Sequence, residues 1–176
     1  MIVFKRNYSM PSMNGLLIGR FQPFHLGHLD ALKFALSKVE YLWVGLGSSN
    51  KPIQKNNPFS AEERKIMITD SLDYSLKKRI KIYPIPDLEN HIKWIELIDT
   101  IVPKFNLVFT NDDLTRHLYS KRNVKTISIP FTRREILSGT NIRNMIISDQ
   151  NWLELVPEGT RNLLTNIHVK DRLTGL

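Results

Sequence analysis

Short apolar runs and longer amphipathic stretches alternate along most of the chain. The apolar runs are rich in Leu, Ile, Val and aromatic residues, as is typical of strands buried on both faces of a parallel sheet. They lie at 15–20, 41–46, 80–85, 107–110 and 124–129. Each run is bounded by Gly, Pro, Asn or Ser, residues that favour turns. The pattern therefore predicts five strands.

Between these runs, apolar residues recur every three or four positions, as on the buried face of a helix. The predicted helices cover about 28–38, 61–72, 94–101, 113–119, 140–147 and 158–167. Thr140 is the expected cap of the fifth helix, and the sixth is expected to be the last. Strands that alternate with helices are typical of βαβ units. We therefore predict an α/β fold, a single doubly wound (Rossmann-like) parallel sheet with helices on both faces.

Composition narrows the class of protein. The chain has 176 residues, of which 41% are hydrophobic, so it lies outside the disordered class. We expect one domain over 13–176 and a flexible N-terminal extension over 1–12, which lacks periodicity. The absence of cysteine excludes disulfides, Cys-ligated zinc and thiol catalysis. No apolar run approaches the ~20 residues of a membrane helix or forms a secretory signal, so we expect a cytoplasmic protein without a membrane partner.

The charge balance favours an anionic partner. Lys and Arg number 25 against 17 Asp and Glu, a formal net charge of +8. Charge alone leaves nucleic acid and phosphorylated metabolites open. Many basic residues lie at junctions between strands and helices rather than along one stripe, so we do not expect a nucleic-acid partner.

The loop after the first strand carries the clearest motif, Gly19-Arg-Phe-Gln-Pro-Phe-His-Leu-Gly-His28. In such sheets ligands bind beyond the carboxyl ends of the strands, and the first amides of a helix are free donors for anions. Gly27 lets a phosphate approach the backbone, and His25, His28 and Arg20 add donors. Together they predict a polyphosphate site. Two histidines without a third ligand at suitable spacing make a metal site the weaker interpretation.

A second motif, Ser138-Gly-Thr-Asn-Ile-Arg143, also enters a helix. Its hydroxyls, its glycine and the first amides of the helix could bind an anion, and Arg143 could reach back to it. An ordinary helix cap with a solvated arginine is the alternative. Other nucleotide and hydrolase motifs are missing: no Walker A lysine follows a glycine loop, 45–47 lacks the third glycine of a dinucleotide fingerprint, and no Gly-x-Ser-x-Gly elbow occurs.

Together the two motifs resemble those of the nucleotidyltransferase superfamily, and more narrowly the archaeal-type nicotinamide-mononucleotide adenylyltransferases. The matching stretches run from residue 13 onward and are Gly19–His28, Gly47-Ser48, Asn57–Arg64, Pro84–Asp87 with Trp94, and Ser138–Arg143. The resemblance implies adenylyl transfer from ATP to nicotinamide mononucleotide, which gives NAD and pyrophosphate. It further implies Mg²⁺ carried with the ATP phosphates, no tightly bound organic cofactor, and a homo-oligomer such as a hexamer.

The resemblance also assigns site residues. As catalytic residues that hold the ATP phosphates it implies Arg20, His25, His28 and Arg143. As further ATP-binding residues it implies Gly19, Phe21, Gln22, Gly27, Asp112, Ser138, Gly139 and Thr140. For the mononucleotide it implies Asp87, His91 and Trp94, with no protein metal site. The chain departs from the family at His91, where Asn is common, at Asn111-Asp112, where Gly-Asn is common, and over 51–56.

Chemical reasoning agrees with this reaction, because attack on the α-phosphorus of ATP needs positioning and charge stabilisation rather than a protein nucleophile. Alternatives stay open for the acceptor and for the class. Another member of the superfamily could act on phosphopantetheine or a flavin phosphate. A basic nucleic-acid-binding module and a nucleotide sensor without activity are the other classes. Trp94 has the helical spacing to Leu97 and Ile98 of an ordinary core residue.

Overall fold

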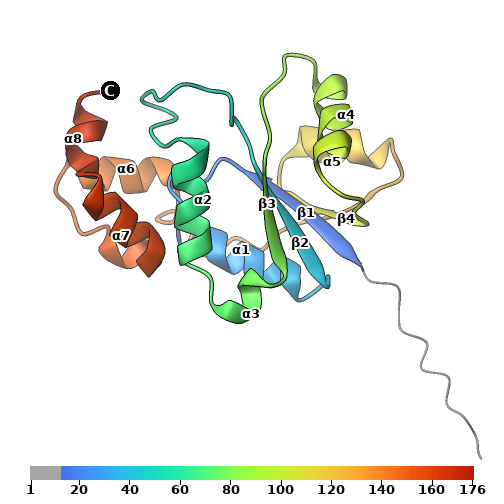
Figure 1. Cartoon of the computed structure of the whole chain (residues 1–176), viewed down its shortest axis with the longest axis horizontal. Helices are drawn as coiled ribbons and strands as arrows, with labels where there is room; N and C mark the ends of the chain where they lie inside the picture. Colours follow the sequence, from blue (N-terminus) through green and yellow to red (C-terminus); the bar gives the residue numbers. More distant parts are fainter. Residues whose placement is uncertain (1–12) are drawn as a thin grey trace, which may run out of the picture.

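The computed structural model describes residues 13–176, so the extension expected over 1–12 lies outside the described residues. Its centre is a five-stranded parallel sheet of order β3-β2-β1-β4-β5 (Figure 1). The strands are β1 (Asn14–Gly19), β2 (Tyr41–Leu46), β3 (Ile80–Pro84), β4 (Leu107–Phe109) and β5 (Lys125–Ile127). The predicted doubly wound α/β fold is confirmed.

The strand order reverses at the centre of the sheet. Chain order runs outward from β1 to β2 and β3, then crosses back to β4 on the other side of β1 and continues to β5. In register, Gly15 of β1 lies between Leu42 of β2 and Leu107 of β4. The loops after β1 and β4 therefore lead in opposite directions. In sheets of this kind, ligands bind in the crevice between two such loops.

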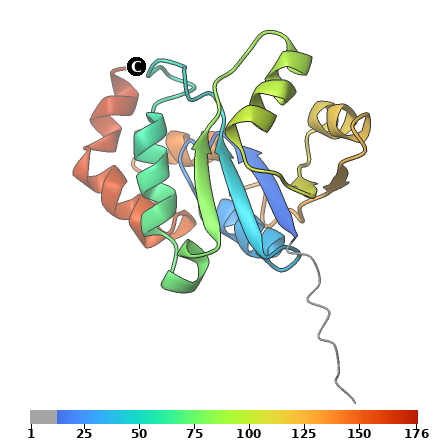
Figure 2. The same cartoon turned by 45° about the vertical axis from the view of Figure 1, so that its right-hand side comes forward.

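Helices cover both faces of the sheet (Figures 1 and 2). They are α1 (Leu26–Leu36), α2 (Ala61–Asp70), α3 (Tyr74–Lys77), α4 (His91–Ile101), α5 (Asp113–Ser120), α6 (Gly139–Ile147), α7 (Glu158–Asn166) and α8 (Val169–Thr174), with a short 3₁₀ turn at Leu153–Leu155. None of these helices, over residues 13–176, is long and apolar enough to cross a membrane.

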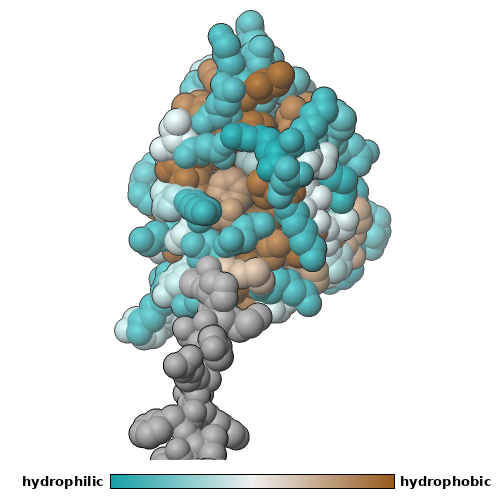
Figure 3. All heavy atoms as spheres, turned by 90° about the vertical axis from the view of Figure 1, so that its right-hand side faces the viewer, coloured by the Kyte–Doolittle hydropathy of each residue, from teal (hydrophilic) through white to brown (hydrophobic). Residues whose placement is uncertain are grey.

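Alternate residues of the strands feed two separate cores. Leu17 and Phe109 pack with α1, α2 and the last three helices, whereas Leu16 and Val108 pack with α4 and α5. This alternation explains why the strands are apolar at almost every position. The face that carries α4 and α5 shows apolar side chains among polar ones (Figure 3), and Ile92 is 64% exposed there.

Three local predictions are wrong. The helix predicted to start at 28 begins at Leu26, because His25 caps it. Ser138 rather than Thr140 caps α6, with its side chain accepting a hydrogen bond from the Asn141 N–H. The helix over 158–167 is not the last, because the chain turns through a left-handed His168 (φ 48°) and forms α8.

Candidate active site

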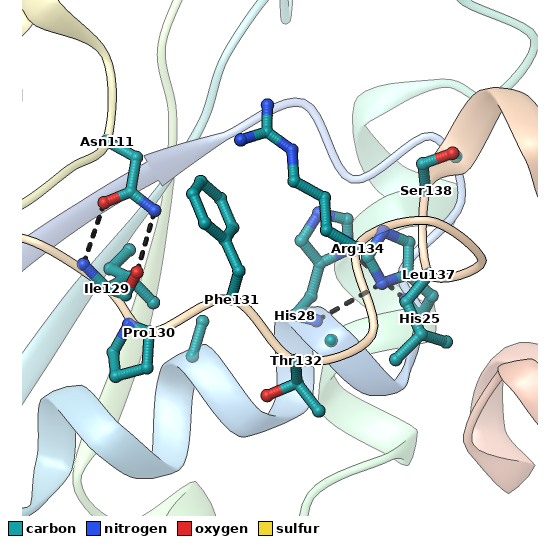
Figure 4. A pocket seen from close by; sticks show the side chains of 13 residues that line it. His25, His28, Asn111, Ile129, Pro130, Phe131, Thr132, Arg134, Leu137 and Ser138 are labelled. Atoms are coloured by element: carbon teal, nitrogen blue, oxygen red, sulfur yellow. Dashed lines mark hydrogen bonds between the residues drawn. The ribbon is translucent and has the colours of Figure 1, made fainter.

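The loop after β1 reaches α1 through two histidines that cap each other. The Nδ1 atom of His25 accepts the His28 N–H at 3.3 Å, and the Nδ1 atom of His28 accepts the His25 N–H at 3.3 Å. The two rings stack with centroids 3.6 Å apart (Figure 4). The pair thus forms a capping box in which imidazoles take the places of the usual hydroxyl and carboxylate.

This pairing fixes the protonation of both rings. A nitrogen that accepts a backbone N–H carries no proton itself, so each neutral imidazole carries its proton on Nε2. Burial lowers the pKa of His25 to about 4. Burial, with the nearby His25 as a smaller cause, lowers the pKa of His28 well below its usual value. At neutral pH the site therefore presents two uncharged N–H donors.

The second motif meets the first at one backbone carbonyl. Nη1 of Arg143 donates to the Gln22 carbonyl at 2.6 Å, and Nη2 donates to the Thr140 hydroxyl at 3.3 Å. A Cβ at Gly139 would lie 2.6 Å from the same Gln22 oxygen, so only glycine fits there. Burial, and then the charge of Arg20, lowers the pKa of Arg143. Two cations therefore lie near each other, an arrangement that a bound polyphosphate would relieve.

An open cavity of about 320 Å³ joins these elements (Figure 4). The predicted residues that line it are His25, Gly27, His28, Ser138 and Gly139. The other lining residues are Ala31, Asn111, Ile129, Pro130, Phe131, Thr132, Arg134 and Leu137. The cavity combines donors at one end with an apolar surface at the other, as a nucleoside phosphate requires.

Sequence reasoning assigned no site residue to the loop after β5, which builds the apolar part of the cavity. The Asn111 amide exchanges two hydrogen bonds of 2.9 Å with the Ile129 backbone, which extends the pairing of β4 and β5 by one step. Arg134 lies over the Phe131 ring, 4.1 Å from its centroid. The available signal was position, because this loop follows a strand and so lies at the ligand-binding edge.

Other predicted ATP residues do not line the cavity. Phe21 is buried and fills the space beside Gly19, where a Cβ would lie 2.8 Å from its ring. Both ends of the Gln22 amide bind protein: Nε2 donates to the Phe59 carbonyl, and Oε1 accepts the Phe59 N–H. Thr140 lies in the first turn of α6 beside Arg143. Asp112 caps α5 by accepting the Thr115 N–H at 2.7 Å, a hydrogen bond that lowers its pKa.

The predicted mononucleotide residues lie outside this cavity, after β3. Asp87 accepts the Ser48 N–H at 3.1 Å and pairs through its backbone with Asn50. His91 is the exposed first residue of α4, and Trp94 packs partly buried against the core beneath α4. Asp87 lies beside the loop after β2, whereas α4, which carries His91 and Trp94, lines a surface pocket together with α5 on the β4 side of the sheet.

The described part of the chain holds no group of three His, Asp or Glu that could bind a metal ion.

Comparisons with known proteins agree with this geometry. A family described as cytidylyltransferase-like matches residues 16–145. The chain is similar to a nicotinamide-nucleotide adenylyltransferase of Pyrococcus abyssi, with 36% identity over 93% of this chain and 89% of that protein. It is also similar to a nicotinamide-nucleotide adenylyltransferase of Thermococcus sibiricus, with 39% identity over 93% of this chain and 89% of that protein.

Among solved structures, the chain is similar in fold to a bifunctional NMN adenylyltransferase/ADP ribose pyrophosphatase of Francisella tularensis, crystallised with AMP and a manganese ion. The TM-score is 0.80 at 24% identity, over 94% of this chain and 52% of that one. This chain therefore spans about half of that protein.

Proposed function

We propose a function on the premise that this chain belongs to the cytidylyltransferase-like family and, within it, to the nicotinamide-nucleotide adenylyltransferases. The chain is a nucleotidyltransferase that moves the adenylyl group of ATP to nicotinamide mononucleotide, forming NAD and pyrophosphate. The observation that most directly supports this function is the pair of imidazoles with Nε2–H donors beside the amino end of α6.

The triphosphate binds at the polar end of the cavity. The Nε2–H groups of His25 and His28, with the first amides of α6 beyond Ser138, donate to its oxygens. Arg20 and Arg143 add positive charge beside them. The nucleoside lies against the apolar loop after β5, and Asp112 contacts its ribose.

An oxygen of the mononucleotide phosphate then attacks the α-phosphorus, and the bond from that phosphorus to the β-phosphate oxygen breaks. Negative charge grows on the departing pyrophosphate, where the two histidines and the two arginines stabilise it. Because their donors are in place before substrate binds, little reorganisation is needed during the reaction. No protein nucleophile takes part.

Mg²⁺ enters with ATP. Residues 13–176 offer no cluster of three acidic or imidazole ligands for it, so the phosphate oxygens of the substrate would supply ligands, and the bound ion would neutralise part of the triphosphate charge.

The mononucleotide binds on the other side of the α-phosphate, over the loops after β2 and β3. We assign Asp87 and His91 to its polar groups and Trp94 to its nicotinamide ring. A homo-oligomer such as a hexamer and a location in the cytoplasm complete the proposal.

An acceptor panel tests this function. The protein is incubated with ATP, Mg²⁺ and one acceptor at a time, and the release of pyrophosphate is measured. The acceptors are nicotinamide mononucleotide, nicotinate mononucleotide, phosphopantetheine and flavin mononucleotide. Release with a pyridine mononucleotide is expected. Release with another acceptor alone would refute the assignment of Asp87 and Trp94, and release with none would favour a nucleotide sensor or a nucleic-acid-binding module.

A further inference from the structure

Arg64, in the first turns of α2, is a fully buried arginine with an unusual set of partners. Its guanidinium and Nε donate to the backbone carbonyls of Arg20 at 2.8 Å, Gly47 at 2.7 Å, Ser48 at 3.4 Å and Ser60 at 3.1 Å. Burial lowers its pKa, while the charge of Asp87 opposes this effect. A buried cation bonded to neutral carbonyls is costly, and such groups are retained where they fix a local arrangement.

The carbonyls that Arg64 binds belong to two different halves of the site. Arg20 follows β1 and adjoins the phosphate-binding histidines, so its loop serves ATP. The nucleoside cavity extends from there towards β4 and β5, so an acceptor reaches the α-phosphate from the opposite side, over the ends of β2 and β3. Gly47 and Ser48 lie at this opposite side.

Ser48 continues the connection towards the acceptor. Its carbonyl accepts from Nη2 of Arg64, and its N–H donates to the Asp87 carboxylate at 3.1 Å. Asp87 follows β3 and is further held by Asn50. A continuous set of hydrogen bonds therefore runs from the phosphate-binding loop through Arg64 to the loop after β3.

We propose that Arg64 is a positioning residue that sets the distance between the two bound nucleotides. This inference rests on the proposed function. Reacting atoms must lie about 3–3.5 Å apart, and a displacement of about 1 Å lowers the rate by about 100-fold. A residue that holds both loops through their carbonyls is suited to maintain that distance without touching either substrate.

The chain offers a matched control in Arg79. Its guanidinium donates to the carbonyls of Glu40, Leu36 and Val39 at 2.7–2.9 Å, which is the same chemistry at the amino end of β3, far from the carboxyl edge. Arg64→Lys and Arg79→Lys each keep the charge and lose most of these bonds. We expect Arg64→Lys to lower kcat by at least about tenfold with both KM values within about threefold, and Arg79→Lys to leave kcat within about twofold.

Binding of product gives a readout that simple destabilisation would not change. NAD spans both halves of the site, whereas AMP and nicotinamide mononucleotide each occupy one half. If Arg64 sets their separation, Arg64→Lys lowers the affinity for NAD by at least about tenfold and the affinity for each half by no more than about threefold, because only the linked ligand depends on the spacing. Calorimetry on protein shown to be folded by circular dichroism measures all three.

The proposal is overturned if Arg64→Lys matches Arg79→Lys in kcat, or if NAD and its two halves lose affinity equally. Wild-type protein without adenylyl transfer would instead refute the proposed function itself. Should Arg64→Lys not fold, hydrogen exchange of the wild type decides: ATP alone must slow exchange over 46–50, and mononucleotide alone must slow it over 19–22. If each ligand slows exchange only in its own loop, the proposed link between the two loops is refuted.

Discussion

His28 has two separable tasks, and replacing it by Glu or by Ala distinguishes them. Its Nδ1 accepts the His25 N–H at the start of α1, and its Nε2–H is proposed to donate to the ATP phosphates. A glutamate at this third helical position can still accept the same N–H, as glutamate does in an ordinary capping box, but it has no hydrogen to donate. Alanine can do neither.

The two losses differ in size. Removal of the cap costs about 1 kcal/mol of folding free energy, whereas removal of one preorganised donor to a developing anion costs about 2.7–4 kcal/mol in the transition state. We therefore expect His28→Glu and His28→Ala both to lower kcat by at least about 100-fold. Only His28→Ala should lose about 1 kcal/mol in the free energy of unfolding.

Steady-state release of pyrophosphate measures kcat, and urea unfolding measures stability. A His28→Glu protein that folds normally and turns over at near the wild-type rate would refute the proposed donor role of Nε2–H. A variant that loses stability but little activity would leave His28 as a capping residue alone.

Three further outcomes are expected. The folded-state pKa of His25 is about 4, below the unfolded value near 6.5, so the unfolded chain binds more protons than the folded chain between these values. The free energy of unfolding should therefore fall as the pH drops from about 6.5 towards 4. A urea midpoint that does not change over this range would contradict a buried neutral His25 ring. Gly139→Ala would set a Cβ 2.6 Å from the Gln22 carbonyl, so we expect a loss of about 1–3 kcal/mol and a higher KM for ATP; Gly175→Ala, whose Cβ would meet nothing closer than 3.4 Å, is the control for thermal unfolding. Trp94→Ala should raise the KM for the mononucleotide much more than the KM for ATP, and equal effects on both would make Trp94 a core residue only.

The sequence predicted the sheet well because the central strands β1, β2 and β4 are buried on both faces and are therefore apolar at almost every position. It also predicted that both motifs lie where a loop enters a helix, since turn residues and helical periodicity are local signals. The two helices at the end of the chain were harder to predict from the sequence. His168 takes a left-handed conformation although it is not a glycine, so the sequence gives no local signal for the break between α7 and α8.

Contacts between distant residues could not be read in the same way. That both ends of the Gln22 side chain bind Phe59, and that Arg143 reaches the Gln22 carbonyl, depends on how segments 37 and 121 positions apart pack. The exchange of hydrogen bonds between His25 and His28 was local, yet imidazoles rarely replace the hydroxyl and carboxylate of a capping box, so the pair indicated only an anion site.

That exchange joins folding to chemistry at the level of single atoms. By accepting backbone N–H groups, the two Nδ1 atoms start α1 and at the same time fix the protons on Nε2, so the tautomers needed to bind phosphate are set by the helix cap. Burial keeps the rings neutral in the absence of ligand, which avoids adding two positive charges beside Arg20 and Arg143. A bound triphosphate can accept hydrogen bonds from both Nε2–H groups without loss of either cap, because each Nδ1 still accepts its backbone N–H. These hydrogen bonds strengthen as negative charge grows on the leaving pyrophosphate, which is the condition for an interaction to accelerate the reaction rather than merely to hold the substrate.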